Sequence, residues 1–178
     1  MTISTRELTD TVPQAGRLQA ILLRTDVRGP MTSTDDVEAV AGLGLVGDHR
    51  TAGRQTDSAA KRQVTLIQAE HLPVIAALTG HDTVDPALLR RNLVIEGINL
   101  ASLRERRFTI GSVLLEGTGW CHPCSRMEEA LGAGGFQAMR GHGGITARVL
   151  DGGPIGVDDP IEVVADPAAP GAGPAVRS

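Results

Sequence analysis

Lysine, cysteine, aromatic residues and long apolar runs are all scarce in this chain of 178 residues. Lys61 is the only lysine, so the chain alone is a poor candidate for pyridoxal phosphate chemistry, which needs a lysine Schiff base. No apolar run approaches the roughly 18 residues of a membrane-spanning helix. The polar N-terminal segment lacks the apolar core of a secretory signal. We therefore expect a cytoplasmic protein that has no membrane partner.

The charge pattern bears on the choice of ligand. A net charge of −4 argues against a nucleic-acid partner, because general nucleic-acid binders are normally basic. Five arginines nevertheless fall within residues 90–107. Guanidinium groups suit phosphate and carboxylate oxygens, so this span is either a pocket for a small anion or a solvated surface.

Short β-like runs, separated by glycine and proline, predict a mainly β fold of the barrel or sandwich type with a few short helices. The predicted strands are residues 17–25, 37–42, 62–68, 92–97, 107–117, 145–150 and 160–164. The predicted helices are residues 68–80, 85–92, 125–132 and 135–141. We expect residues 1–16 to be an N-terminal extension, residues 17–165 to form one domain, and the Pro/Ala/Gly-rich tail 166–178 to be disordered.

Both cysteines lie in the segment GWCHPCSRM, residues 119–127, just before a predicted helix. Disulfides rarely persist in the cytoplasm, and the chain has no second C-x-x-C and no H-x-x-x-H to complete a structural zinc site. Ser125 and Glu128 have the spacing of a capping box, which predicts that Cys124 lies next to the first N–H groups of the helix. Such a position favours a thiolate. Cys124 is therefore the candidate reactive thiol, and a pair of buried, inert cysteines is the alternative.

Two glycine-rich segments are further candidates for a binding site. GLGLVGDHR, residues 42–50, predicts a turn that aims Asp48 and His49. RGHGGITARVL, residues 140–150, places Gly143 and Gly144 before a strand, where glycine lets the backbone approach a ligand closely. A hairpin with a solvated Asp-His pair and a flexible loop explain the two patterns equally well.

Taken in order, six segments resemble the MOSC domain, the module named for the C-terminal region of molybdenum-cofactor sulfurases. They are GLGLVGDHR, RQVTLIQAEHL, RRNLVIEGINL, FTIGSVLLEGT, PCSRM and GHGGITARVLDGGPIGVDD. The resemblance covers about residues 17–164. It implies a β-barrel of mostly antiparallel strands with a few short peripheral helices. It also implies that the chain binds a molybdenum cofactor or carries sulfur for one.

The resemblance also implies a set of site residues. Cys124 matches the cysteine of the family's PC motif, which makes it the implied catalytic residue and molybdenum ligand, whereas Cys121 lies outside that motif. The implied cofactor-binding residues are Arg62, Arg90, Asn92, Asp48, His49, Gly143 and Gly144. We expect Arg62, Arg90 and Asn92 to surround one cavity with Cys124 at its edge. Asp158 stands where the family usually has glycine, a departure that affects the local turn.

Three functions remain open. The first is an oxidoreductase that reduces N-hydroxylated small molecules, with electrons from a separate reductase because the chain has no flavin or iron–sulfur motif. The second is a sulfur carrier, in which a cysteine desulfurase loads a persulfide on Cys124. The third is a non-catalytic module that stores or hands over the cofactor. The phosphate of molybdopterin suits the arginine-rich span, and a soft thiolate suits both molybdenum ligation and persulfide chemistry.

Overall fold

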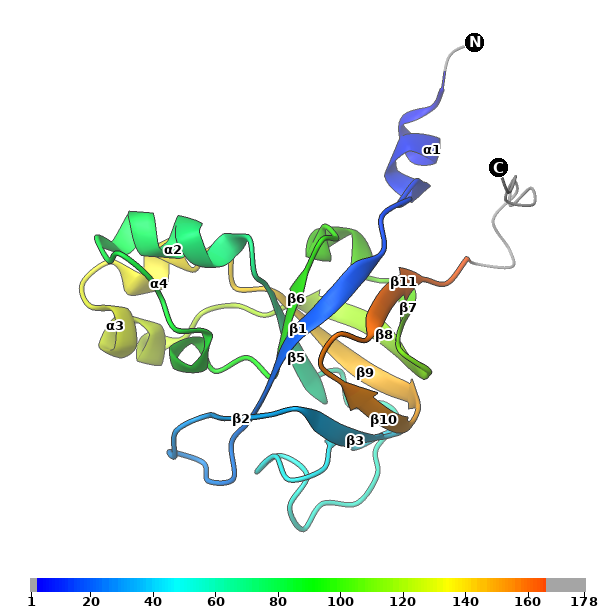
Figure 1. The fold of residues 1–178 in the computed structure, drawn as a ribbon, viewed down its shortest axis with the longest axis horizontal. Coiled ribbons are helices and arrows are strands. Elements are labelled where there is room, and N and C mark those ends of the chain that lie inside the picture. Colours follow the sequence, from blue (N-terminus) through cyan, green and yellow to red (C-terminus); the bar gives the residue numbers. More distant parts are fainter. Residues whose placement is uncertain (1–2, 166–178) are drawn as a thin grey trace.

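Seven strands form the barrel in the computed structural model, which describes residues 3–165 (Figure 1). They are β1 (Gly16–Leu23), β5 (Val64–Gln68), β6 (Leu93–Glu96), β7 (Arg107–Ile110), β8 (Val113–Trp120), β9 (Ile145–Asp151) and β11 (Pro160–Val163). The strand order is β11-β7-β8-β9-β5-β6-β1, and pairing of β1 with β11 closes the ring. Every pair is antiparallel except β5 with β6. The predicted mainly β, mostly antiparallel barrel is confirmed.

The remaining strands lie at the rim of the barrel. β2 (Thr32–Thr34) pairs with the end of β1, and β3 (Asp36–Val40), β4 (Gly44–Leu45) and β10 (Gly153–Gly156) form a separate small sheet. The helices are α1 (Thr5–Asp10), α2 (His71–Thr79), α3 (Ser125–Leu131), α4 (Gly135–Ala138) and the 3-10 turns η1 (Pro86–Leu89) and η2 (Leu100–Leu103). None of the helices within residues 3–165 is long and apolar enough to span a membrane.

Two apolar cores explain why α2, α3 and α4 gather at one end of the molecule, on the left in Figure 1. The first core fills the barrel and has Phe108 as its largest buried side chain. The second lies between these helices and the outer face of β5 and β6, where Ile67 and Val94 pack against Ile75 and Met127. Because both faces of β5 are covered, residues Val64 to Ile67 are all buried, as is usual for strands in a parallel pair.

Several predicted elements differ in detail. Residues 107–117 form a hairpin, β7 and β8, because Gly111 turns the chain with a positive φ of 56°. The segment 85–92 forms only the short turn η1, which begins at Pro86 after the N-cap Asp85: the Ala87 N–H donates to Asp85 Oδ1 at 2.9 Å. The predicted disordered tail 166–178 lies outside the described residues.

The predicted capping box of the helix after the cysteines is wrong. Helix α3 begins at Ser125, so the N-cap is Cys124 itself, and no side chain caps the helix. Glu128 instead accepts hydrogen bonds from the N–H groups of Gly134 and Phe136, at 2.8 and 2.9 Å, and so ties α3 to α4. The spacing resembles a capping box, but the loop after the helix takes the carboxylate.

Asp158 shows how the departure from the family's glycine is accommodated. Its φ is 75°, the left-handed conformation that glycine adopts easily and that aspartate tolerates better than most residues. The Asp158 carboxylate binds the guanidinium of Arg17 on β1, which fixes the turn against the barrel. The turn therefore keeps the backbone path that a glycine would take.

Candidate functional site

The two cysteines occupy different environments although only two residues separate them. Cys121 follows the end of β8 and is 2% exposed. Its N–H donates to the Gly144 carbonyl at 2.8 Å, and its sulfur accepts a hydrogen bond from Arg62 Nη2 at 3.3 Å. Cys124, at the N-cap of α3, is exposed. Of the two thiols, only Cys124 is open to a ligand from solvent.

Arg91 contacts the backbone of Cys121 and is 5% exposed. Its guanidinium donates to the carbonyl oxygens of Gly143 at 2.7 Å, Leu89 at 2.8 Å and Cys121 at 3.2 Å. Burial lowers the pKa of Arg91, while negative charge on Cys121 and Cys124 raises it. Within residues 3–165 no carboxylate forms an ion pair with this buried cation. The thiol segment therefore rests on a positive charge that the described chain does not neutralise.

Gly143 and Gly144 pack against the protein's own backbone. A Cβ at Gly143 would lie 2.4 Å from the carbonyl oxygen of Cys121, and one at Gly144 would lie 1.8 Å from that of Leu66. Gly144 also has a φ of 84°. Both glycines are buried. The sequence predicted that the backbone approaches a ligand closely at these glycines, but in the structure it approaches the backbone of Cys121 and Leu66 instead. The loop thereby holds Cys121 and Arg91 in place through hydrogen bonds.

Asp48 is buried at the turn after β4 and is surrounded by protein donors. Its carboxylate accepts hydrogen bonds from the N–H groups of Arg24 at 3.3 Å and Arg50 at 3.0 Å, and from Asn92 Nδ2 at 2.9 Å. His49 Nδ1 lies 3.0 Å from the other side of the same carboxylate. The side chains of Asp48 and Asn92 therefore join the turn after β4 to the segment that precedes β6.

Asn92 is 4% exposed and uses its whole amide within the protein. Besides Asp48, its Nδ2 donates to the Leu22 carbonyl at 3.2 Å. Its Oδ1 accepts from the N–H of Thr65 at 3.2 Å and from the Thr65 hydroxyl at 2.9 Å. These bonds hold β1, β5 and β6 together at one end. Asn92 therefore has a structural role that the expectation of cofactor binding did not include.

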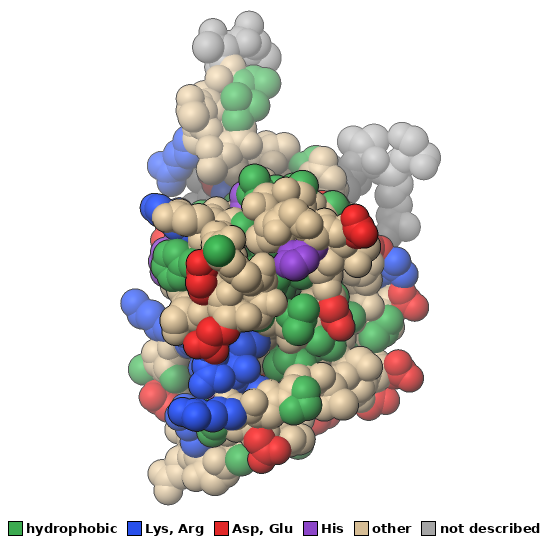
Figure 2. Space-filling model, turned by 90° about the vertical axis from the view of Figure 1, so that its left-hand side faces the viewer, with side chains coloured by type: hydrophobic (Ala, Val, Ile, Leu, Met, Phe, Trp, Pro, Cys, Tyr) green, Lys and Arg blue, Asp and Glu red, His purple; other side chains and the backbone are tan. Residues whose placement is uncertain are grey.

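Arginines line two cavities, each of which includes an arginine that lies close to the thiol segment: Arg126 in the first and Arg62 in the second. The first cavity has a volume of about 510 Å³, and its lining includes Arg28, Arg90, Arg126, Met31, Leu88 and Glu129. The second cavity has a volume of about 230 Å³, and its lining includes Arg50, Arg54, Arg62, Gln55 and Gln63. Figure 2 shows Lys and Arg side chains gathered in one group on the face of the molecule that carries the helices.

The expected single cavity is thus corrected. Arg62 lines the second cavity, Arg90 lines the first, and Asn92 is buried between strands and lines neither. Arg90 still lies near Cys124. Burial lowers the pKa of Arg90, Arg126 lowers it further, and negative charge on Cys124 raises it. The candidate site therefore consists of one exposed thiol, a first cavity that Arg126 connects to Cys124, and a second cavity that Arg62 connects to Cys121.

Three arginines of this site were not singled out in the sequence: Arg28, Arg50 and Arg54. They come from loops that are far apart in the chain. Arg126 was expected from its position two residues after Cys124, as a source of positive charge near the thiol. No spacing rule connects Arg28, in the loop between β1 and β2, with Arg90 after η1, although Arg90 Nη2 donates to the Val27 carbonyl at 3.1 Å.

A family model decides the classification. The model described as "MOSC domain" matches residues 48–162, more than half of the chain. The chain belongs to the MOSC domain family. The expected family is thus confirmed. The match includes Asp48 and His49, residues 90–92 and both cysteines of the site described above.

Solved structures support the fold of this MOSC domain. The chain is similar to the YuaD protein from Bacillus subtilis, with 19% identity and a TM-score of 0.73, over 86% of this chain and 98% of that one. It is also similar to YiiM from Escherichia coli, with 20% identity and a TM-score of 0.64, over 84% and 70%. YiiM from Geobacillus stearothermophilus has 16% identity and a TM-score of 0.65, over 84% and 75%. At these identities the likeness concerns the fold. No curated protein matches the chain in sequence.

Proposed function

We propose that this MOSC domain binds a molybdenum cofactor through Cys124 and reduces N-hydroxylated small molecules. The observation that carries the proposal is the exposed Cys124 thiol at the N-cap of α3, two residues before Arg126, which lines the first arginine-rich cavity. A thiolate is a soft ligand that suits this metal. Cys121 is a poorer candidate because it is buried and its sulfur already accepts a hydrogen bond from Arg62.

The charges around the thiol suit an anionic cofactor. A molybdenum cofactor carries negative charge on its phosphate and on its metal-binding sulfurs. Two positive charges lie near the thiol segment in the described chain. Arg91 contacts the backbone of Cys121 and has no acidic partner within residues 3–165, and Arg90 lies near Cys124. Guanidinium groups bind phosphate through paired hydrogen bonds, which makes arginine suitable for this task. The residues present therefore fit the group.

We place the cofactor's phosphate in the second cavity. Arg50 and Arg62 lie close enough there to repel each other: burial lowers the pKa of Arg50, and Arg62 lowers it further. An anion between the two guanidiniums relieves this repulsion. Arg62 also contacts Cys121, three residues before the proposed ligand. The expected cofactor role of Arg62 is thereby kept, and Arg50 and Arg54 are added to it.

The proposed reaction converts an N-hydroxylated nitrogen into an amine or amidine. The N–O bond breaks, the oxygen leaves as water, and the reaction consumes two electrons and two protons. The bound cofactor supplies the two-electron chemistry, and a separate reductase supplies the electrons. In this chain, Cys124 would hold the metal, and the arginines that line the two cavities would hold the anionic groups. Solvent supplies the protons through the exposed surface around Cys124.

The decisive experiment compares two cysteine variants after purification from a host that makes the cofactor. We expect Cys124→Ser to fold normally but to lose most of its molybdenum, its pterin and its reductase activity. Cys121→Ser is the matched control, and we expect it to keep most of all three. Metal analysis, pterin fluorescence after oxidation and circular dichroism measure these outcomes. Full molybdenum content in Cys124→Ser contradicts the proposal.

The exposed thiol also favours the sulfur-carrier function as a second candidate. An accessible thiolate accepts a sulfane sulfur from the persulfide of a cysteine desulfurase, and leaves the donor as a thiol. In this case the purified protein contains no molybdenum, and mass spectrometry finds one additional sulfur on Cys124 after incubation with a desulfurase and cysteine. The same metal analysis therefore separates the two functions.

A further inference from the structure

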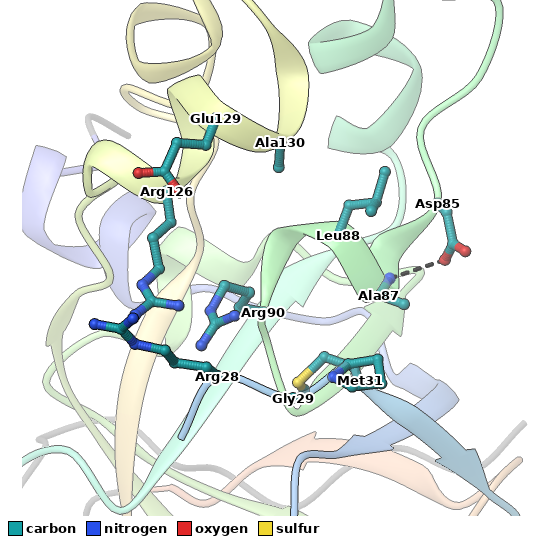
Figure 3. A pocket seen from close by; sticks show the side chains of 11 residues that line it. Arg28, Gly29, Met31, Asp85, Ala87, Leu88, Arg90, Arg126, Glu129 and Ala130 are labelled. Carbon is teal, nitrogen blue, oxygen red and sulfur yellow. Dashed lines mark hydrogen bonds between the residues drawn. The ribbon is translucent and has the colours of Figure 1, made fainter. Parts of the chain in front are cut away.

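Three guanidinium groups converge in the first cavity. Figure 3 shows Arg28, Arg90 and Arg126 directed toward one another from three separate segments: the loop after β1, the end of η1 and helix α3. Within residues 3–165 none of the three forms an ion pair with a carboxylate. Burial lowers the pKa of Arg90, and repulsion by the positive charge of Arg126 lowers it further. Such a cluster lowers its free energy when an anion lies among the guanidiniums.

The acidic residues of this cavity do not neutralise the cluster. The Asp85 carboxylate accepts a hydrogen bond from the Ala87 N–H at 2.9 Å and lies on the opposite side of the cavity in Figure 3. Glu129 also lines the cavity and raises the pKa of Arg90, but it forms no ion pair in the described chain. Three cations therefore face one carboxylate that is not engaged elsewhere.

The side of the cavity away from the guanidiniums is apolar. Met31 and Leu88 lie there, and Figure 3 shows them apart from the arginine cluster. Leu88 is 47% exposed, so part of its apolar surface is available to a ligand. A volume of about 510 Å³ is in the range of sites that enclose a small organic molecule. The cavity thus suits a molecule with an apolar body and an anionic group at one end.

The cavity lies beside the segment that carries the proposed metal ligand. Arg126 lines the cavity and follows Cys124, the N-cap of α3, by two residues. A small molecule held by the arginines therefore lies close to the start of α3. This position is suited to a substrate, because the reacting group must reach the metal while the rest of the molecule is held elsewhere.

We propose that the substrate of this protein is an N-hydroxylated compound that carries a carboxylate or phosphate, and that Arg28, Arg90 and Arg126 bind this anionic group. Met31 and Leu88 contact the apolar part of the substrate. The inference rests on the proposed reductase function and narrows its substrate class. The competing occupant of the same cavity is the phosphate of the cofactor, and the test below distinguishes the two.

The test compares benzamidoxime with 4-carboxybenzamidoxime, which differ in one negative charge, and uses a chemically reduced viologen as electron donor. In the wild-type holoprotein we expect kcat/KM to be about tenfold higher for the carboxylate, in line with a hydrogen-bonded charge pair. Arg28→Ala should reduce this ratio about tenfold through KM of the carboxylate, with unchanged molybdenum and pterin content. Arg107→Ala is the matched control and should keep the wild-type ratio, because Arg107 is exposed and lies on β7, at the opposite end of the molecule from α2, α3 and α4 in Figure 1.

The outcomes separate this inference from the proposed function. Equal kcat/KM for both amidoximes in the wild type overturns the inference and leaves the reductase standing. Loss of pterin and molybdenum in Arg28→Ala assigns the cavity to the cofactor and likewise overturns it. Calorimetric binding of the product 4-carboxybenzamidine needs no turnover, so it tests the cavity even if no reduction is found. Binding that Arg28→Ala weakens about tenfold, relative to benzamidine, supports the site, and equal binding in both proteins contradicts it.

Discussion

Asn92 provides the sharpest test of whether a motif residue serves the ligand or the fold. In Asn92→Ala, the buried N–H of Thr65 and the buried carboxylate of Asp48 each lose a hydrogen bond, at 3.2 and 2.9 Å. The Leu22 carbonyl and the Thr65 hydroxyl also lose their bonds to the amide. A buried polar group that loses its partner costs about 1–3 kcal/mol, so two such groups predict a loss of about 2–6 kcal/mol in the free energy of unfolding.

Urea denaturation followed by circular dichroism measures this loss, and thermal unfolding should show a decrease in Tm of about 5–15 °C for a domain of this size. The matched control is Asn99→Ala. Asn99 is exposed and its Oδ1 accepts one hydrogen bond, from the Ala101 N–H at 3.1 Å. Loss of this cap costs about 1 kcal/mol.

At a temperature where Asn92→Ala is still folded, we expect it to keep its cofactor, since the amide has no free donor or acceptor to offer. An unfolding free energy within about 1 kcal/mol of wild type, together with loss of molybdenum, refutes the reasoning and restores Asn92 as a cofactor ligand.

Two further predictions concern the loop that supports the thiols. Gly144→Ala should unfold the protein or destabilise it far more than Gly80→Ala. A Cβ at Gly144 would meet the Leu66 carbonyl, whereas nothing lies within 4 Å of a Cβ at Gly80. Because both glycines have a positive φ, urea denaturation of the two variants isolates the effect of the steric clash. Burial, and then His142, lower the pKa of His71 below its usual value of 6.5, so the unfolded chain takes up a proton first as the pH falls. The free energy of unfolding should therefore decrease as the pH falls below about 6.5, and His71→Phe should weaken this dependence in denaturation series at pH 5 and 7.5; an identical pH dependence in both proteins would show that His71 does not contribute.

The barrel was predictable because its signals are local. Alternating apolar residues and glycine turns fix where strands run, and Pro86 after Asp85 fixes where η1 begins. Boundaries were less predictable. The sequence 107–117 reads as one strand because both arms of the hairpin are rich in β-branched and apolar residues, and only the φ of Gly111 divides them. The Ser125–Glu128 pattern misled because a loop beyond the helix offers the carboxylate better partners.

The site was predictable only in part. Cys124 stands out from a short motif, and its exposure agrees with its candidacy. The cavity that each arginine lines depends on contacts between segments that are remote in the sequence. Arg28 lines the first cavity because the loop after β1 lies against Arg90. The structural roles of Asp48 and Asn92 could not be predicted either, because the sequence does not show whether a carboxylate or an amide is buried or exposed to solvent.

The sequence by itself determined the family and the barrel and singled out Cys124 as the candidate thiol, because these follow from segment order and from residue types that act locally. The tertiary structure decided which thiol is open to solvent, which polar groups are consumed within the protein, and which charges remain to bind a ligand. The physical reason is that burial and electrostatic pairing depend on distances between residues remote in the chain. Closure of the barrel, which pairs β1 with β11 and places β6 beside β1 and β5, sets these distances.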